Sequence, residues 1–164
     1  MYTTFFAGCI LATFIAISGI FSSLGLAKAG EAQKIGDLTL MHPTLRATVP
    51  GAKVGAGYLV ILNNGSSGDR LIGAEASFAG KTEIHEMKMV DQVMKMRQLE
   101  GGLPIAAGTT EKLAPGGNHI MFMKLQVPLK TGDKHTVTLE FERVGKVELS
   151  FDVKSIAETM KMKH

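Results

Sequence analysis

The stretch HTVTLEFERVGKVELSFDV, residues 135–153, decides the fold class of this chain. Its apolar side chains stand at every second position, first over residues 137–141, with His135 in the same phase, and again over residues 147–153. Successive side chains of a β-strand point to opposite faces, so this period of two predicts two strands that each bury one face. Val144 and Gly145 lie between the two runs and predict the turn that joins them.

Shorter strands with turn signals between them are predicted upstream. They cover residues 38–40, 55–62, 70–76, 83–89, 94–96, 103–105, 109–113 and 119–123. Asn63-Asn64-Gly65 and Pro115-Gly116-Gly117 are the clearest turn signals, and Met41-His42-Pro43 is expected to close the first strand. The sequence shows no convincing amphipathic helix and no internal repeat. Many short strands separated by turns predict an all-β domain, an antiparallel sandwich or barrel.

Residues 1–29 have the composition of a secretory leader. Residues 4–26 are almost wholly apolar or small, and Ala27-Lys28-Ala29 supplies an A-x-A cleavage site. We therefore expect a signal peptide cleaved after Ala29 and a periplasmic protein without a membrane attachment. The apolar run is long and no Lys or Arg precedes it, so an uncleaved anchor is the alternative. Phe6-Ala7-Gly8-Cys9 faintly resembles a lipoprotein site, but Cys9 precedes most of the run.

Cleavage would leave a domain over residues 30–153 and a tail over residues 154–164. Cys9 is the only cysteine, so the exported domain would have neither a disulfide nor the thiolate of a blue-copper centre. The formal net charge of +3 falls to +2 when Lys28, the leader's only charged side chain, is removed. So small a charge does not indicate binding to nucleic acid or to an anionic membrane surface.

Imidazole and thioether side chains are concentrated between residues 85 and 123. This segment holds two of the five histidines and six of the ten methionines, namely His85, His119, Met87, Met89, Met94, Met96, Met121 and Met123. On a strand, Met87 and Met89 share one face with His85. A turn at residues 91–92 would then set Met96 opposite Met87 and Met94 opposite Met89.

On the third strand of this segment His119, Met121 and Met123 share one face, so imidazoles and thioethers are expected to meet at one rim. Thioether sulfur suits Cu(I), whereas zinc prefers thiolate, imidazole or carboxylate, and magnesium and calcium prefer oxygen. Methionine also fills gaps in protein cores, and the residues alone leave copper binding and packing equally open.

The spacing His85-x10-Met96-x22-His119-x-Met121 resembles the signature of the PCuAC family of periplasmic copper(I) chaperones, with one more residue in the middle gap. That residue falls in a loop-rich segment, where length varies at little cost. Other segments also resemble the family: Arg46-Ala47-Thr48, Pro50-Gly51-Ala52, Ala56-Gly57-Tyr58, Asn63-Asn64-Gly65, Ile84-His85-Glu86, Glu100-Gly101-Gly102-Leu103 and Pro115-Gly116-Gly117. The likeness extends from about Leu38 to Val153.

This resemblance implies a cupredoxin-like, Greek-key β-sandwich. It also implies that His85, Met96, His119 and Met121 bind Cu(I). The implied task is delivery of copper towards the Cu(A) site of cytochrome c oxidase. The receiving partner would be a periplasmic protein such as the Cu(A) subunit or a thioredoxin-like assembly factor.

Further side chains are candidates for supporting or substitute ligands. They are Met87, Met94 and Met123 near the main set, and Met160, Met162 and His164 in the tail. The tail is expected to be flexible, either a frayed basic end or a mobile copper-binding arm. His42 is expected to be a plain residue at a strand end, and His135 a residue at the rim of the domain.

Two other functions are weighed against the chaperone. One is a copper-dependent redox enzyme with the same ligands, although a histidine brace would need His at the mature N-terminus, where Gly30 is expected. No Ser-His-Asp or Cys-His arrangement is legible, so the chain is not expected to be an enzyme. The other is a metal-free interaction module in which the methionines form a binding patch.

Overall fold

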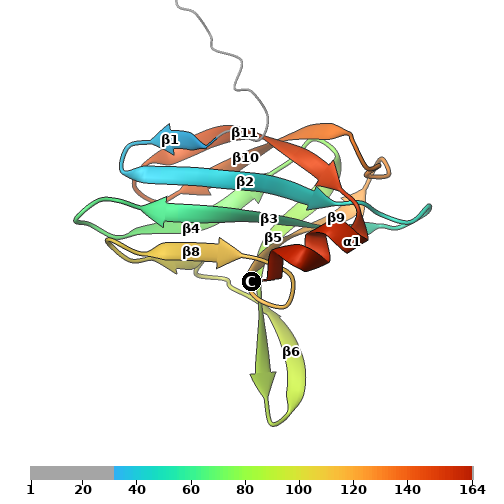
Figure 1. Ribbon diagram of the computed structural model, residues 1–164, viewed down its shortest axis with the longest axis horizontal. Coiled ribbons are helices and arrows are strands. Elements are labelled where there is room, and N and C mark those ends of the chain that lie inside the picture. Colours follow the sequence, from blue (N-terminus) through green and yellow to red (C-terminus); the bar gives the residue numbers. More distant parts are fainter. Residues whose placement is uncertain (1–31, 164) are drawn as a thin grey trace, which may run out of the picture.

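The structure, a computed structural model, describes residues 32–163 (Figure 1). The expected leader and His164 lie outside these residues, and the cleavage site stays a prediction. The elements are β1 Gln33–Ile35, β2 Leu38–Arg46, β3 Val54–Asn63, β4 Asp69–Glu75, β5 Ala79–Val90, β6 Val93–Gln98, β7 Leu103–Ile105, β8 Thr110–Leu113, β9 His119–Leu125, β10 Lys134–Phe141, β11 Gly145–Lys154, α1 Ile156–Met160 and the 3₁₀ helix η1 Lys161–Lys163.

The strands form one continuous hydrogen-bonded sheet. Its order is β6-β5-β9-β3-β2-β11-β10-β4-β7, and β1 and β8 are added on β2 and β3. The all-β class is confirmed, but the expectation of a purely antiparallel sheet is wrong at one pair. β2 and β11 run parallel, with Thr44 beside Asp152 and Arg46 beside Lys154. Parallel neighbours need a long connection, and here most of the domain lies between β2 and β11. No short sequence motif therefore predicts that these two strands pair.

The sheet encloses one hydrophobic core. Apolar residues of β2, β3, β4, β9, β10 and β11 belong to a single buried cluster. The alternating positions of the last two strands are all buried, as predicted: Val137, Leu139, Phe141, Val147, Leu149, Phe151 and Val153. Full burial of such a side chain contributes about 1.5–3 kcal/mol. His135, the second residue of β10, lies against Phe78, with ring centroids 4.9 Å apart.

β2 is longer than the sequence predicts. The expected end at Met41-His42-Pro43 is instead a bulge between Met41 and Thr44, after which the strand continues to Arg46. His42 is exposed in this bulge with φ of 53°. Pro43 lacks an N–H group and is tolerated where the ladder is interrupted. The continuation carries Arg46 to the site described below.

The chain end differs from the expected flexible tail, because residues 156–163 are helical. The Ser155 side chain accepts a hydrogen bond from the Glu158 N–H, and the Glu158 carboxylate accepts one from the Ser155 N–H. This reciprocal pair is a capping box, and its Ser-x-x-Glu signal is present in the sequence. Thr159 is fully buried. Within residues 32–163 no helix has the length and apolar composition needed to span a membrane.

β5 and β6 form a hairpin that projects from the body of the domain (Figure 1). The predicted turn at Asp91 and Gln92 is confirmed, and both residues have positive φ, 51° and 63°. Positive φ at both central residues matches the right-handed twist of a tight hairpin. β6 is the last strand of the sheet and is exposed at all six positions.

Two adjacent glycines before β7 give a matched test of the packing. Gly102 has φ of 74°, and a Cβ there would collide with the Leu71 carbonyl oxygen, whereas a Cβ at Gly101 would meet nothing within 4 Å. We expect Gly102→Ala to lower the free energy of unfolding in urea by about 1–3 kcal/mol, because it adds left-handed strain and a backbone clash. Gly101→Ala should change it by less than about 0.5 kcal/mol. Equal losses in the two variants would contradict this account.

Candidate metal centre

The predicted ligands lie on one face of neighbouring strands. In the β5–β6 hairpin Met87 stands opposite Met96 and Met89 opposite Met94, which confirms the predicted register. The pairing of β5 with β9 is a feature that only the structure shows. It sets His85 directly opposite His119.

Strand alternation places Met121 on the same face as His119. The intervening Ile120 and the following Phe122 are fully buried in the core. On the adjacent strand β3, Ala56 stands opposite Met121, and its small side chain leaves room above the sheet. The result is a depression over β9 and β3, with β6 and the β8–β9 turn at its sides.

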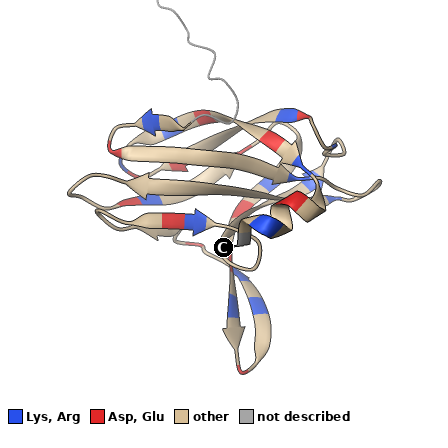
Figure 2. Cartoon of the chain, viewed as in Figure 1, with Lys and Arg blue, Asp and Glu red and all other residues tan. Residues whose placement is uncertain are grey.

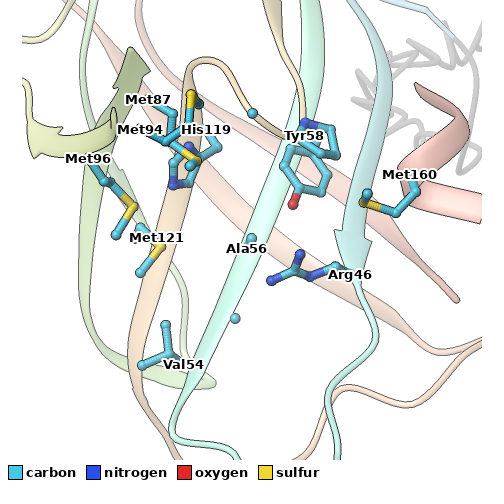
Figure 3. Close-up of a pocket in the computed structure, with 13 residues that line it drawn as sticks. Arg46, Val54, Ala56, Tyr58, Met87, Met94, Met96, His119, Met121 and Met160 are labelled. Carbon is cyan, nitrogen blue, oxygen red and sulfur yellow. The ribbon is translucent and has the colours of Figure 1, made fainter. Parts of the chain in front are cut away.

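This depression is a pocket of about 530 Å³ (Figure 3). The residues that line it are Arg46, Val54, Gly55, Ala56, Tyr58, Met87, Met94, Met96, Pro115, Gly116, His119, Met121 and Met160. Three of the four predicted ligands, Met96, His119 and Met121, are therefore among the lining residues. His85 is not, but its ring lies beside that of His119, with centroids 5.9 Å apart.

His119 lines the pocket with a neutral imidazole ring, one nitrogen of which is not hydrogen-bonded. Its Nδ1–H donates to the Gly117 carbonyl oxygen at 2.9 Å, which leaves Nε2 as an acceptor. Burial lowers the pKa of His119, and the nearby His85 and Arg46 act in the same direction, against an opposing contribution from the Gly117 hydrogen bond. A neutral imidazole with an uncommitted nitrogen is the form that binds metals.

His85 is also held by a hydrogen bond, but through Nε2, whereas His119 is held through Nδ1. Its Nε2 lies 2.7 Å from a carboxylate oxygen of Glu83, and Glu83 also pairs with Lys81. These two hydrogen bonds, that of Lys81 first, lower the pKa of Glu83, so it is an ionised acceptor for a His85 Nε2–H. The remaining His85 Nδ1 is buried and has no hydrogen-bond partner in the described part of the chain. Histidines that bind metals characteristically donate their other N–H to a carboxylate or carbonyl.

The donors present favour a soft metal. Within residues 32–163, no three or more His, Cys, Asp or Glu side chains are grouped to hold a metal ion. A metal at this pocket would therefore need thioether sulfur as well as the two imidazoles. Thioethers are suited to Cu(I) and are poor ligands for zinc, magnesium or calcium. The residues thus fit Cu(I).

The supporting candidates divide into two groups. Met87, Met94 and Met160 line the pocket, and Met160 reaches it from α1 (Figure 3). Met123 lines a separate hollow with Lys81 and Lys124. Met162 belongs to η1 and is not among the residues that line the pocket. His164 lies outside the described residues.

Arg46 and Tyr58 were not expected at the site. They lie on the side of the pocket away from the methionines of β5, β6 and β9, and beside Met160 (Figure 3). Burial raises the pKa of Tyr58, and the Arg46 charge opposes this rise. The sequence indicates these residues only as parts of family-like segments, since they come from β2 and β3, far along the chain from the His/Met segment.

Residues 38–153 match the protein family described as "Putative lipoprotein LpqE-like", and the chain belongs to this LpqE-like family. A curated relative is "Putative lipoprotein Lxx21020" of Leifsonia xyli subsp. xyli (strain CTCB07), which is 38% identical over 91 residues. The match covers 56% of this chain and 55% of the relative, so the chain spans about half of that protein's length.

Solved structures confirm the resemblance to PCuAC domains and their cupredoxin-like fold. The copper-bound PCuAC domain from PmoF2 has a TM-score of 0.65 at 22% identity, covering 76% of this chain and 98% of that one. The apo PCuAC domain from PmoF1 has a TM-score of 0.65 at 26% identity, covering 76% and 99%. CuI-DR1885 from Deinococcus radiodurans has a TM-score of 0.56 at 26% identity, covering 76% and 80%.

The depressed pKa of His119 predicts an acid-sensitive apo-protein. The unfolded chain takes up a proton on His119 near the ordinary pKa of about 6.5, whereas the folded chain does so only at lower pH. This contribution to stability is complete above about pH 6.5 and is lost as the pH falls to the folded-state pKa. Urea unfolding at about pH 7.5 and about pH 5.5 brackets the ordinary value and should show the loss.

His119→Gln should remove part of this pH dependence in the metal-free protein. His42→Gln is the control, because His42 is exposed in the β2 bulge. An unchanged slope of stability against pH in His119→Gln would show that His119 is not the responsible group.

Proposed function

We propose that the protein is an exported copper(I) carrier, a copper chaperone, that binds one Cu(I) through His85, Met96, His119 and Met121. The observation that carries this proposal is the pair of uncommitted ring nitrogens, His85 Nδ1 and His119 Nε2. The two rings lie side by side, and the thioethers of Met96 and Met121 line the pocket with His119. The similar structures of a copper-bound PCuAC domain and of CuI-DR1885 support it.

The ligand set suits transfer rather than permanent retention. All four ligands are uncharged when they bind, so no thiolate has to be removed from the metal when it leaves. Met96 is 50% exposed, whereas His119 is 5% exposed. A partner's ligand can therefore replace the Met96 thioether first, while the buried His119 and the partly buried His85 keep the copper in place. Soft neutral donors also stabilise reduced copper, which favours a carrier over a redox enzyme.

Supporting ligands would come from the methionines that line the pocket. Met87 and Met94 are on the hairpin close to Met96, and Met160 stands on the opposite side. Each can take a position vacated during exchange. For Met123, Met162 and His164 a copper-binding role stays a prediction.

The proposed destination of the copper is the Cu(A) site of cytochrome c oxidase. The receiving partner would be the Cu(A) subunit itself or a thioredoxin-like assembly factor in the periplasm. Export is supported by the description of the family and of its curated relative as lipoproteins. Attachment of a lipid at Cys9 is the alternative to release after Ala29, and both positions lie outside the described residues.

Replacing two of the thioethers tests the proposed ligands. The variant Met96→Leu/Met121→Leu keeps apolar volume but removes both sulfur atoms. We expect anaerobic titration against a competing chelator to show a loss in Cu(I) affinity of more than about 100-fold, which is the upper end of the cost of losing an outer partner. X-ray absorption of the unmodified protein should show both nitrogen and sulfur around copper.

The matched control is Met41→Leu/Met89→Leu, which removes two thioethers that do not line the pocket. It should bind Cu(I) as the unmodified protein does. Equal affinity of both double variants, or a copper shell of nitrogen and oxygen only, would contradict the proposed ligand set.

Glu83 supplies a second test, because it touches His85 and not the pocket itself. We expect Glu83→Gln to weaken Cu(I) binding by about 10- to 100-fold, the usual cost of losing a carboxylate that orients a histidine ligand. Glu100→Gln, on the loop after β6, is the control and should have no effect. If Glu83→Gln binds Cu(I) with full affinity, the carboxylate does not orient His85.

A further inference from the structure

The hairpin that carries the methionines has a basic opposite face. In the β5–β6 register Lys88 stands directly across from Lys95, and both are exposed. Like charges placed opposite each other destabilise a strand pair. Neither lysine has an ion-pair partner within residues 32–163, whereas the neighbouring Arg97 pairs with Glu86 at 2.9 Å. Lys and Arg positions, blue in Figure 2, occur on both strands of the hairpin.

A groove of about 420 Å³ lies along this basic face. It is lined by Lys88, Val90, Lys95, Met96 and Arg97. Met96 also lines the pocket with the proposed copper ligands. One side chain is thus shared by the groove and the metal pocket, and a molecule in the groove would touch a copper ligand.

The hairpin also has an open strand edge and exposed apolar side chains. β6 ends the sheet, so its outer backbone groups are available to pair with another strand. Val90 is 38% exposed and Val93 is 57% exposed, on the same face as the two lysines. Exposed apolar side chains beside unpaired positive charge are typical of a surface that a partner covers.

We propose that the edge and basic face of the β5–β6 hairpin dock an acidic surface, rich in Asp and Glu, of a protein that exchanges copper with this one. Charge complementarity selects the partner, because carboxylates would neutralise the facing pair Lys88 and Lys95 and speed the encounter. Docking along the groove then brings the partner's ligands to Met96. The copper step rests on the proposed function, but docking of the acidic surface does not.

A membrane fits this surface less well than a protein does. The turn of the hairpin holds the acidic residue Asp91, which would repel an anionic bilayer that approached the tip (Figure 2). The open edge of β6 presents backbone N–H and C=O groups that lipid cannot satisfy, whereas a partner strand can.

The test uses two synthetic peptides of equal length that carry the same Met and His ligands, one flanked by Asp and Glu and the other by Ser and Gln. Binding to the full-length, metal-free protein is followed by NMR, and Cu(I) transfer from the loaded protein by stopped flow. We expect the acidic peptide to shift β5–β6 amides and to receive copper about tenfold faster than the neutral one at low salt. Added salt should remove this advantage.

Lys88→Gln/Lys95→Gln should abolish the preference for the acidic peptide and leave Cu(I) affinity unchanged. The control, Lys112→Gln/Lys130→Gln, removes the same charge from residues that line neither the groove nor the metal pocket, and it should keep the preference. An equal preference in both double variants would overturn the proposal.

Three other results would also decide for or against this docking surface. Lysine-dependent binding to phosphatidylglycerol vesicles without a preference for the acidic peptide would overturn the proposal in favour of a membrane. Self-association of Lys88→Gln/Lys95→Gln with full peptide binding would overturn it by showing that the lysines only keep hairpins apart. Lysine-dependent docking on a protein that binds no Cu(I) would support the docking surface and contradict the proposed function.

Discussion

The register of β5 against its two neighbours is the constraint on which the site depends. Ile84 stands opposite Ile120, and both are buried in the core. Because side chains alternate along a strand, this apolar pair on one face forces His85 to stand opposite His119 on the other. A slip of β5 by one residue would turn His85 away from His119, turn Met87 away from the pocket, and expose Ile84. The hydrophobic core therefore fixes the position of the candidate ligands.

Hydrogen bonds fix the orientation of the two imidazoles that the strand register places side by side. Gly117 and Glu83 each engage one ring nitrogen, on different rings, and leave the other nitrogen uncommitted. The two imidazoles are thus held in place and in a defined tautomer before any metal arrives. In the proposed carrier this preorganisation reduces the entropy lost when copper binds, because the strands and these two hydrogen bonds already hold the ligands in position.

The site lies where a rigid sheet meets a projecting hairpin. His119 is buried and His85 is partly buried, whereas Met94 and Met96 stand on the exposed hairpin. Exposure of these thioethers sacrifices some hydrophobic stabilisation, and it leaves the pocket open to an incoming ligand. The same hairpin carries Lys88 and Lys95 on its other face, so the geometry couples partner contact to the copper ligands through Met96.

The sequence by itself determined the all-β class, the turn at residues 91–92 and the pairing of Met87 with Met96, because alternation and tight turns depend on residues close together in the chain. The Ser155-x-x-Glu158 signal of the α1 capping box is also in the sequence, although a flexible tail was expected there. Only the tertiary structure decided that β2 and β11 run parallel, that His85 meets His119, and that Arg46, Tyr58 and Met160 form the other side of the pocket. These features join segments that are far apart in sequence, and their pairing is settled by which arrangement buries the whole core at once.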